Sequence, residues 1–177
     1  MIIRDLLLLI RAPKEFVYSF TYPRNRYVTI LPYDKATTII GKDLVEKIKR
    51  KYPELTVHFS GSAVLGIVGQ KDIDLFIECD KSELEKYKTG ISKIVGQPRK
   101  VKKDFVEWSF GTRGCDVQVL LIDPNHPLYK KQINTQKVLE NNRKILQEYE
   151  KMKLQSNGVL QREYARRKLK FFINHGL

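Results

Sequence analysis

The feature that most constrains this chain is a short run in which acidic and apolar residues alternate, Asp72-Ile73-Asp74-Leu75-Phe76-Ile77. Successive side chains of a β-strand point to opposite faces of the sheet. A strand over 72–79 therefore places both aspartates on one face and directs Ile73, Leu75 and Ile77 into the core. The run predicts a sheet that has one buried face and one acidic face.

A second acidic strand is predicted at 115–122, as the return half of a hairpin. The strand-like run 104–110 is followed by the turn residues 111–114, which include two glycines. In the second strand Asp116 and Gln118 share one face, and the apolar residues take the other. If this strand pairs beside the first with the polar faces aligned, three carboxylates converge.

Three carboxylates with no neighbouring pair of His or Cys are typical ligands of Mg²⁺ or Mn²⁺ rather than zinc. Two such ions about 3.5–4 Å apart stabilise the attacking and leaving oxygens when a phosphoryl group is displaced. We therefore predict that Asp72, Asp74 and Asp116 are catalytic and metal-binding residues, with Asp116 nearest the attacking hydroxyl. Asp-x-Asp pairs are also common at strand edges, so the alternative is a domain that keeps the fold without the chemistry.

A small turn, Ser60-Gly61-Ser62, precedes the first acidic strand, and nine residues separate it from Asp72. A glycine lets a phosphate approach the backbone closely, and a short helical turn predicted at 63–69 would present free N–H groups at its amino end. We predict that Ser60, Gly61 and Ser62 bind nucleotide. The sequence leaves open which of the two serines contacts the β and γ phosphates.

The glycine-serine turn, its spacing to Asp72-Ile73-Asp74 and the later Asp116 resemble the polymerase-beta-type nucleotidyltransferase superfamily. Within it, the chain resembles the GrpB-like family in its Pro-Tyr-Asp segment, Pro32-Tyr33-Asp34, and in two C-terminal helical signatures at 149–153 and 164–171. The match covers about residues 28–177. This resemblance implies an α+β nucleotidyltransferase fold, in which a mixed β-sheet is backed by helices and C-terminal helices follow.

The same resemblance assigns nucleotide-binding lysines to the C-terminal helices. It implies that Lys153 and Lys168 neutralise phosphate charge. The alternative is that both are ordinary helix-surface lysines.

The chain is strongly basic, with 33 Lys and Arg against 20 Asp and Glu and a net charge of +13. Such an excess attracts nucleotides, nucleic acid or anionic surfaces, although a solvated lysine-rich surface is the alternative. The charge gathers at Pro98–Lys103 and on the last helix. There Arg162, Arg166 and Lys170 share one stripe, and Arg167 beside them is a further predicted nucleotide-binding residue.

The two cysteines, Cys79 and Cys115, form neither a disulfide framework nor a Cys-x-x-Cys pair. A reducing cytoplasm is therefore the expected compartment, with both thiols buried. The apolar run Leu6–Ile10 is too short for a signal sequence or a membrane span, so no membrane association is expected.

The chain length favours one domain. We expect an N-terminal extension at 1–27 that docks on the domain, a catalytic core at 28–125, and a C-terminal helical part at 126–177. Within these we predict strands at Tyr27–Leu31 and Leu55–Phe59, a helix at Thr38–Lys51, a helix opened by the capping box Ser82–Glu85, one long helix at 127–155, and a last helix at 160–174.

These observations predict a Mg²⁺-dependent enzyme that transfers a nucleoside monophosphate from an NTP to a hydroxyl and releases pyrophosphate. The positive charge favours RNA, for example a tRNA end, over a small metabolite or a protein side chain as acceptor. The rival hypotheses are a catalytically inactive nucleic-acid-binding domain and an antitoxin-like regulatory domain on the same fold.

Overall fold

The computed structural model describes residues 8, 12, 17, 19, 20 and 22–177. Most of the extension predicted at 1–27, including nearly all of Leu6–Ile10, lies outside these residues. The chain forms two compact units. The sheet unit comprises Tyr33–Ile67 and Lys71–Gln136, and the helical unit comprises Met1–Pro32, Val68–Gln70 and Lys137–Leu177. The predicted boundaries at 28 and 126 stay a prediction.

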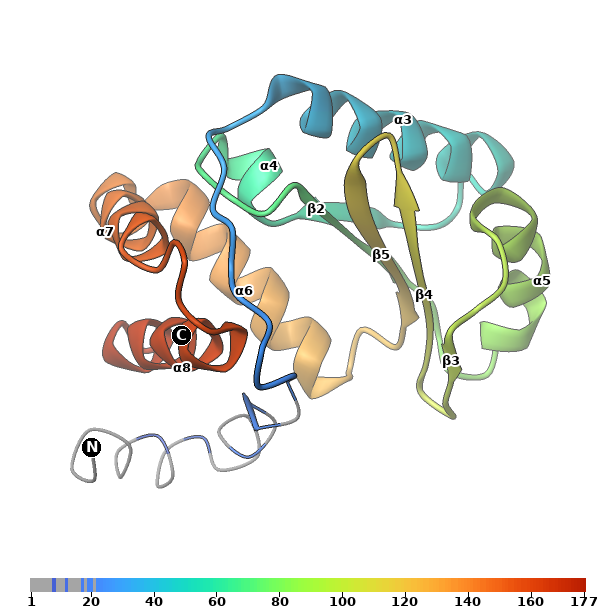
Figure 1. Cartoon of the computed structure of the whole chain (residues 1–177). Helices are drawn as coiled ribbons and strands as arrows, with labels where there is room; N and C mark the ends of the chain where they lie inside the picture. The colour runs from blue at the N-terminus through green and yellow to red at the C-terminus, as the bar shows by residue number, and fades with distance from the viewer. Residues whose placement is uncertain (1–7, 9–11, 13–16, 18, 21) are drawn as a thin grey trace. The chain divides into compact units, whose positions relative to one another are not determined.

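The sheet unit is built on a five-stranded mixed sheet with the strand order β1-β2-β5-β4-β3 (Figure 1). Only β2 and β5 pair in parallel, and the other neighbours are antiparallel. The predicted α+β class, a mixed sheet with helices, is therefore confirmed. The strands are β1 (Val57–Ser60), β2 (Asp72–Glu78), β3 (Lys100–Val101), β4 (Phe105–Thr112) and β5 (Cys115–Ile122).

The predicted hairpin is present as β4 and β5. Its turn residues Arg113 and Gly114 have φ angles of 48° and 76°, and Thr112 pairs with Cys115 on either side of them. Positive φ at both central positions matches the right-handed twist of the flanking strands. The turn therefore fixes the hairpin register and, with it, the face to which Asp116 points.

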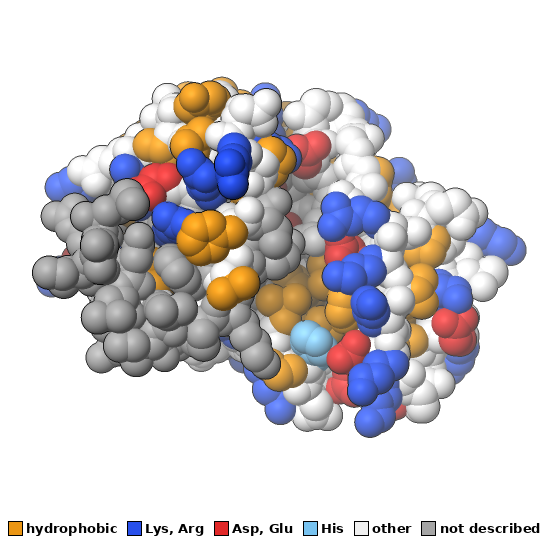
Figure 2. All heavy atoms as spheres, turned by 60° about the horizontal axis from the view of Figure 1, so that its bottom comes forward, with side chains coloured by type: hydrophobic (Ala, Val, Ile, Leu, Met, Phe, Trp, Pro, Cys, Tyr) orange, Lys and Arg blue, Asp and Glu red, His pale blue; other side chains and the backbone are white. Residues whose placement is uncertain are grey.

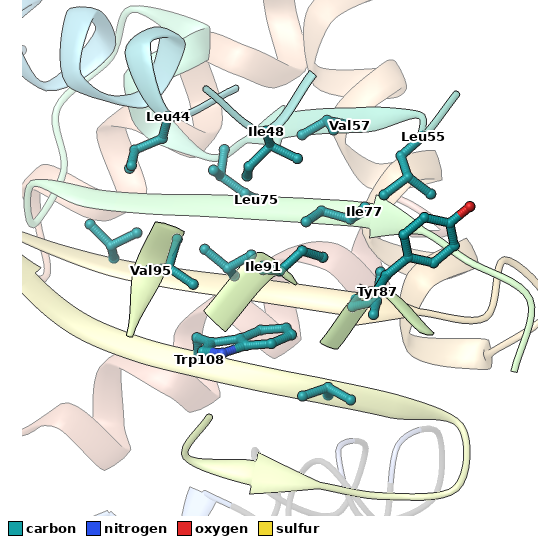
Figure 3. Packing of buried hydrophobic residues seen from close by; sticks show 14 of the residues in the cluster. Leu44, Ile48, Leu55, Val57, Leu75, Ile77, Tyr87, Ile91, Val95 and Trp108 are labelled. Carbon is teal, nitrogen blue, oxygen red and sulfur yellow. The ribbon is translucent and has the colours of Figure 1, made fainter. Parts of the chain in front are cut away.

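One face of the sheet carries the main core and is covered by helices α3 (Lys35–Lys51) and α5 (Leu84–Val95). Figure 3 shows Ile48 of α3 and Ile91 of α5 pointing toward the apolar side chains of β2 and toward Trp108 of β4. The Trp108 indole N–H donates to the Ser92 hydroxyl at 3.1 Å, so its polar atom is satisfied. This core fixes which residues of β2 and β5 face inward.

The two core helices begin in different ways. The Asp34 side chain caps α3 by accepting a hydrogen bond from the Ala36 N–H at 2.9 Å. The capping box predicted at Ser82–Glu85 is wrong, because α5 begins at Leu84 without a side-chain cap. The Ser82 hydroxyl and N–H donate instead to Asp80, so Ser82 completes a turn before the helix.

The opposite face of the sheet is covered at one end by helix α6 (Pro127–Asn141). Tyr129 and Ile133 of this helix pack with Phe76 and Leu120, which lie on β2 and β5. The other end of this face carries the aspartates. The single long helix predicted at 127–155 is wrong, because Asn142 ends α6 and caps a separate helix by accepting from the Ile145 N–H at 3.1 Å.

The helical unit contains α7 (Arg143–Leu154) and α8 (Gln161–Asn174). The strand predicted at Tyr27–Leu31 is not part of the sheet and forms only isolated bridges to Leu160 and Gly69. Val28 nevertheless exchanges backbone hydrogen bonds with Gly158 and Val159 within this unit. The alternation of apolar residues in Tyr27–Leu31 therefore reflects packing of this segment against the C-terminal helices.

Both cysteines are free and buried, as predicted. Among the residues that the structure describes, no helix has the length and apolar character needed to cross a membrane.

Candidate functional site

The three predicted catalytic aspartates lie on one face of the sheet, on adjacent parallel strands. Asp72 of β2 pairs directly with Asp116 of β5, and Asp74 pairs with Gln118. Paired residues of neighbouring strands point to the same face, so the three carboxylates form one group, here called the carboxylate row. Asp72 and Asp116 are exposed and Asp74 is partly exposed. The predicted pairing of the two acidic strands is confirmed.

The register of the carboxylate row is set by the apolar residues between its members. Ile73 and Leu75 are fully buried in the main core, and their β5 partners Val117 and Val119 are buried with them. A shift of one residue in either strand would expose these side chains and bury the acids. Burial on one face therefore holds the acids together on the other.

The row begins immediately after a strained residue. Lys71 has a φ of 61°, and its ammonium lies 3.0 Å from a carboxylate oxygen of Asp34 at the start of α3. The hydrogen bond from Lys71 lowers the pKa of Asp34, as does the capping bond from the Ala36 N–H. This pair links the start of α3 to the entry of β2.

Gly61 lies beside the carboxylate row. Ser60 pairs with Asp74 across β1 and β2, and a Cβ atom on Gly61 would lie 3.1 Å from Asp74 Oδ2. Gly61 also has a φ of 93°, which favours glycine. The next residues, Ser62–Leu65, form the short helix α4 predicted after the turn. The structure thus brings the turn and one carboxylate together.

Sequence reasoning missed Gln136, which contacts this turn. Its side-chain oxygen accepts hydrogen bonds from the Ser60 hydroxyl at 3.0 Å and from the Gly61 N–H at 3.1 Å. Its role depends on a tertiary contact, which the position of a glutamine in a helix does not indicate. The two hydrogen bonds join residues that are 76 and 75 positions apart in the sequence.

The carboxylate row supplies oxygen ligands of the kind that Mg²⁺ prefers. Among the described residues, no group of three or more His, Cys, Asp and Glu side chains is arranged to hold a metal ion. Mg²⁺ usually takes only one or two carboxylates and completes its octahedron with waters and substrate phosphates. The donor set therefore fits Mg²⁺ or Mn²⁺ together with a triphosphate, whereas a closed protein cage is not formed.

At the covered end of the same face, Glu78 accepts hydrogen bonds from two residues. His58 Nε2 lies 2.8 Å from Glu78 Oε1, and the Tyr129 hydroxyl donates to the same oxygen. Burial raises the pKa of Tyr129, and the hydrogen bond to Glu78 raises it further. Glu78 therefore links Tyr129 of α6 to the sheet and also bonds His58 of the neighbouring strand β1.

The predicted basic nucleotide ligands all lie in the helical unit. Lys153 is 3% exposed, and its ammonium lies 5.2 Å from the centre of the Tyr149 ring, so it is not a surface lysine. The Lys168 ammonium lies 5.6 Å from the Tyr164 ring centre. Arg167 donates to Glu163 and to the Gln155 carbonyl, each at 3.0 Å. Their contact with phosphate stays a prediction.

The basic cluster predicted at Pro98–Lys103 lies at the sheet edge formed by β3. Arg99, Lys100, Lys102 and Lys103 are exposed, and Arg99 pairs with the buried Glu107 at 3.0 Å. Figure 2 shows Lys and Arg side chains gathered in a line on one face, with acidic side chains beside them. Lysines on an edge strand also prevent pairing with another sheet, so polyanion binding is not their only explanation.

Comparison with solved structures finds Cid1 poly(U) polymerase. Its structure with MgGTP bound matches at 14% identity and a TM-score of 0.47, covering 66% of this chain and 41% of that chain. Its structure with Mg 3'-dATP bound matches at 13% identity and a TM-score of 0.45, covering 77% and 49%. The match spans less than half of the length of these polymerase chains, and similarity at this level assigns no activity.

No protein-family model matches the sequence, and no curated protein sequence matches it. The resemblance to the GrpB-like family stays a prediction.

Proposed function

We propose that this chain is a Mg²⁺- or Mn²⁺-dependent nucleotidyltransferase that moves a nucleoside monophosphate from an NTP to a hydroxyl acceptor. The observation that supports this most directly is the pairing of Asp72 with Asp116, with Asp74 next along the same face. Like charges placed directly opposite each other destabilise a sheet. Carboxylates in this arrangement are therefore better explained by a bound cation than by the fold.

In the proposed reaction the acceptor hydroxyl oxygen bonds to the α-phosphorus, and the bond from that phosphorus to the α,β-bridging oxygen breaks. Pyrophosphate leaves, and Asp116 accepts the hydroxyl proton. Asp72 and Asp74 would hold the cations, and Asp116 would complete the inner site. The cations, when bound, supply neutralisation of the triphosphate and Lewis-acid polarisation of its oxygens. Gly61 leaves room beside Asp74 for the phosphates, because it has no side chain.

RNA is the acceptor class that the net charge of +13 favours. Basic residues at the β3 edge and on α8 would contact its phosphates. Lys153 and Lys168 would neutralise triphosphate charge, as the resemblance to the GrpB-like family implies, and Arg167 is proposed for the same role from the positive charge of the last helix. This part of the proposal depends on charge and family resemblance rather than on the carboxylate row.

The second candidate is a nucleic-acid-binding domain without transferase chemistry. It is favoured by the finding that no three acidic, His or Cys side chains among the described residues are arranged around one ion position. The exposed basic edge at β3 would serve such a domain equally well. The two candidates differ in whether nucleotide turnover occurs at all.

The experiment that separates them incubates the purified chain with each α-³²P-labelled NTP, Mg²⁺ or Mn²⁺, and either total RNA or a small-molecule pool. We expect label transfer to one pool and release of pyrophosphate. The Asp72→Asn and Asp74→Asn variants should lose roughly a thousandfold of this activity, because several kcal/mol of charge stabilisation is removed. Their RNA affinity should stay that of the parent.

Glu54→Gln is the matched control, because Glu54 is an exposed carboxylate of the same unit, just before β1. It should leave transfer unchanged. Absence of turnover of any NTP by the parent, with RNA binding intact, would favour the binding domain instead.

A further inference from the structure

Gln118 of β5 lies beside the carboxylate row, toward the hairpin partner β4. It pairs with Asp74 on β2 and with Ser109 on β4, and paired residues point to the same face of the sheet. Gln118 therefore shares the face of the acids and follows Asp116 by two residues. Residues two apart on a strand are separated by about 7 Å, so the long Gln118 side chain can contact a molecule that binds at Asp116.

The Gln118 amide lies where the covering of this face ends. Further along β5, Leu120 and Ile122 are buried and pack with Tyr129 of α6. Gln118 is partly exposed, and Ser109 beside it is exposed. Among the described residues, neither of these two polar side chains has a hydrogen-bond partner within the chain. Their partners are therefore water or a bound molecule.

Gly111 of β4 leaves open space next to Asp116, with which it pairs. Its φ is not in the positive range that favours glycine, and a Cβ there would meet nothing nearer than the Cys115 carbonyl oxygen at 3.9 Å. Neither the backbone conformation nor the packing therefore requires a glycine at this position. A glycine inside a strand costs stability and often marks a place where a ligand approaches closely.

The terminal ribose of an RNA chain fits this arrangement of groups. It carries two adjacent hydroxyls, and the 2′-hydroxyl both donates and accepts hydrogen bonds. The Gln118 amide offers the complementary pair, an NH₂ donor and a carbonyl acceptor. A ribose whose 3′-hydroxyl lies at Asp116 has its 2′-hydroxyl immediately beside that position, where the amide can reach it.

We propose that Gln118 binds the 2′-hydroxyl of the acceptor's terminal ribose while the 3′-hydroxyl attacks from Asp116, and that Gly111 provides the space for the sugar. This inference rests on the proposed nucleotidyltransferase function and narrows its acceptor to RNA with a free ribose end. The ribose O3′ forms the bond to the α-phosphorus, Asp116 accepts the proton of that hydroxyl, and pyrophosphate leaves. Gln118 exchanges no proton in this step, so it determines specificity.

The test uses short RNAs of random sequence that end either in ribose or in 2′-deoxyribose, so that the two substrates differ in one hydroxyl. We would measure kcat/KM for label transfer from α-³²P-labelled NTPs with Mg²⁺, and the Kd for each RNA, on the full chain. Gln118→Met keeps the side-chain length and loses both hydrogen-bonding groups. The matched control is Gln132→Met, at an exposed glutamine of α6 in the same unit. Urea denaturation checks that each variant is folded.

The parent should prefer the ribose end about tenfold in both kcat/KM and Kd, which is the effect of one hydrogen bond. In Gln118→Met both preferences should disappear, because the variant loses efficiency only with the ribose end. Gln132→Met should keep them. A glutamine that only supports the sheet would affect the two ends equally. Equal losses with the two ends, or a parent without a preference, would overturn the proposal.

Gly111→Val tests the space beside Asp116. Valine favours strands and its Cβ has no close neighbour, so the midpoint of urea unfolding should not fall. The kcat/KM for the ribose-ended RNA should fall about tenfold, because the sugar is displaced. The Kd for α,β-methylene NTP analogues with Mg²⁺ should stay that of the parent. Unchanged transfer, or weaker binding of the analogues as well, would overturn the role of Gly111.

The two proposals fail in different ways. If the parent transfers no label to any RNA, the transferase proposal fails. The Kd values for the two RNA ends then decide alone whether Gln118 binds the ribose. Transfer to both ends with equal efficiency would leave the transferase proposal standing and overturn only the role of Gln118.

Discussion

The two faces of β2 differ in burial and charge, although they alternate residue by residue along one strand. On one face Ile73, Leu75 and Ile77 are fully buried beneath α3 and α5. On the other, Asp72 is exposed and Asp74 is partly exposed. Of two adjacent residues in this part of β2, one therefore packs in the core and the other carries a charge on the opposite face.

The difference between the two faces shows that the sheet gains its stability from the core face. Each buried aliphatic side chain of the core face contributes free energy on folding, whereas the carboxylate row places like charges on directly opposite positions. The core face thus holds these like charges close together. Substitutions on the two faces should separate stability from function.

The largest effect is expected from Leu75→Ala on the core face. Removal of a fully buried leucine side chain leaves a cavity and should lower the free energy of unfolding by about 3 kcal/mol. Asp74→Asn, one residue away, should change it by less than about 0.5 kcal/mol. Urea denaturation of the two variants measures both values. A similar loss in both would mean that the two faces are not energetically distinct.

The next effect concerns the thiol of Cys79, which lies in the core cluster at the end of β2. Burial, with smaller contributions from Glu83 and Asp80, raises its pKa from 9.0 to about 11. The neutral thiol is therefore favoured in the folded state. Stability from this group is complete below pH 9.0 and is lost as the pH rises toward about 11.

Alkylation by iodoacetamide measures this directly. At pH 8 the Cys79 peptide of the folded protein should be modified about a hundredfold more slowly than in urea, because two pKa units separate the states. Mass spectrometry of the Cys79 peptide distinguishes it from Cys115. Equally fast modification with and without urea would contradict the buried, neutral thiol.

A smaller effect is expected from Gly61→Ala, beside the carboxylate row. Its φ of 93° is costly for alanine, and the added Cβ would press on Asp74 Oδ2. We expect a loss of about 2 kcal/mol in the free energy of unfolding together with weaker binding of Mg²⁺-NTP. Gly66→Ala is the control, because it has a φ of 68° but no atom within 4 Å of the new Cβ. It should cost about 1 kcal/mol, the cost of a left-handed conformation for a residue with a Cβ, and leave nucleotide binding unchanged.

These faces also show what could be predicted from the sequence. The strands β2 and β5 could be predicted from the alternation of acidic and apolar residues and from the Arg113-Gly114 turn. The register of the two strands followed from burial of the aliphatic residues that lie between the acids. The carboxylate row followed from these local patterns. The same rule misassigned Tyr27–Leu31, because alternation reports a half-buried extended segment without identifying its partner, here Val159 and Leu160.

Other features depended on single side-chain contacts, which the periodicity of apolar residues in the sequence does not indicate. The end of α6 at Asn142 is decided by one capping bond, and the start of α5 by the turn that Ser82 makes with Asp80. Gln136 was missed for the same reason, because its role arises from a tertiary contact across 75 residues. Short-range patterns therefore predicted the strands that carry the acids, whereas the contact of Gln136 with the turn became visible only in the folded structure.

The smallest effect tests the carboxylate row itself. Asp116→Asn removes one of two like charges that lie directly opposite each other, so it should raise the free energy of unfolding by roughly 0.5 kcal/mol at low salt. The gain should shrink at high salt, where the repulsion in the parent is already screened. Urea titrations at two ionic strengths, with Glu54→Gln as the exposed control, measure it. Adding Mg²⁺ should stabilise the parent more than the variant, because only the parent keeps all three carboxylates. Destabilisation by Asp116→Asn at both ionic strengths would mean that this side chain stabilises the fold. The division into a stabilising core face and a destabilising charged face would then hold for β2 but not for β5.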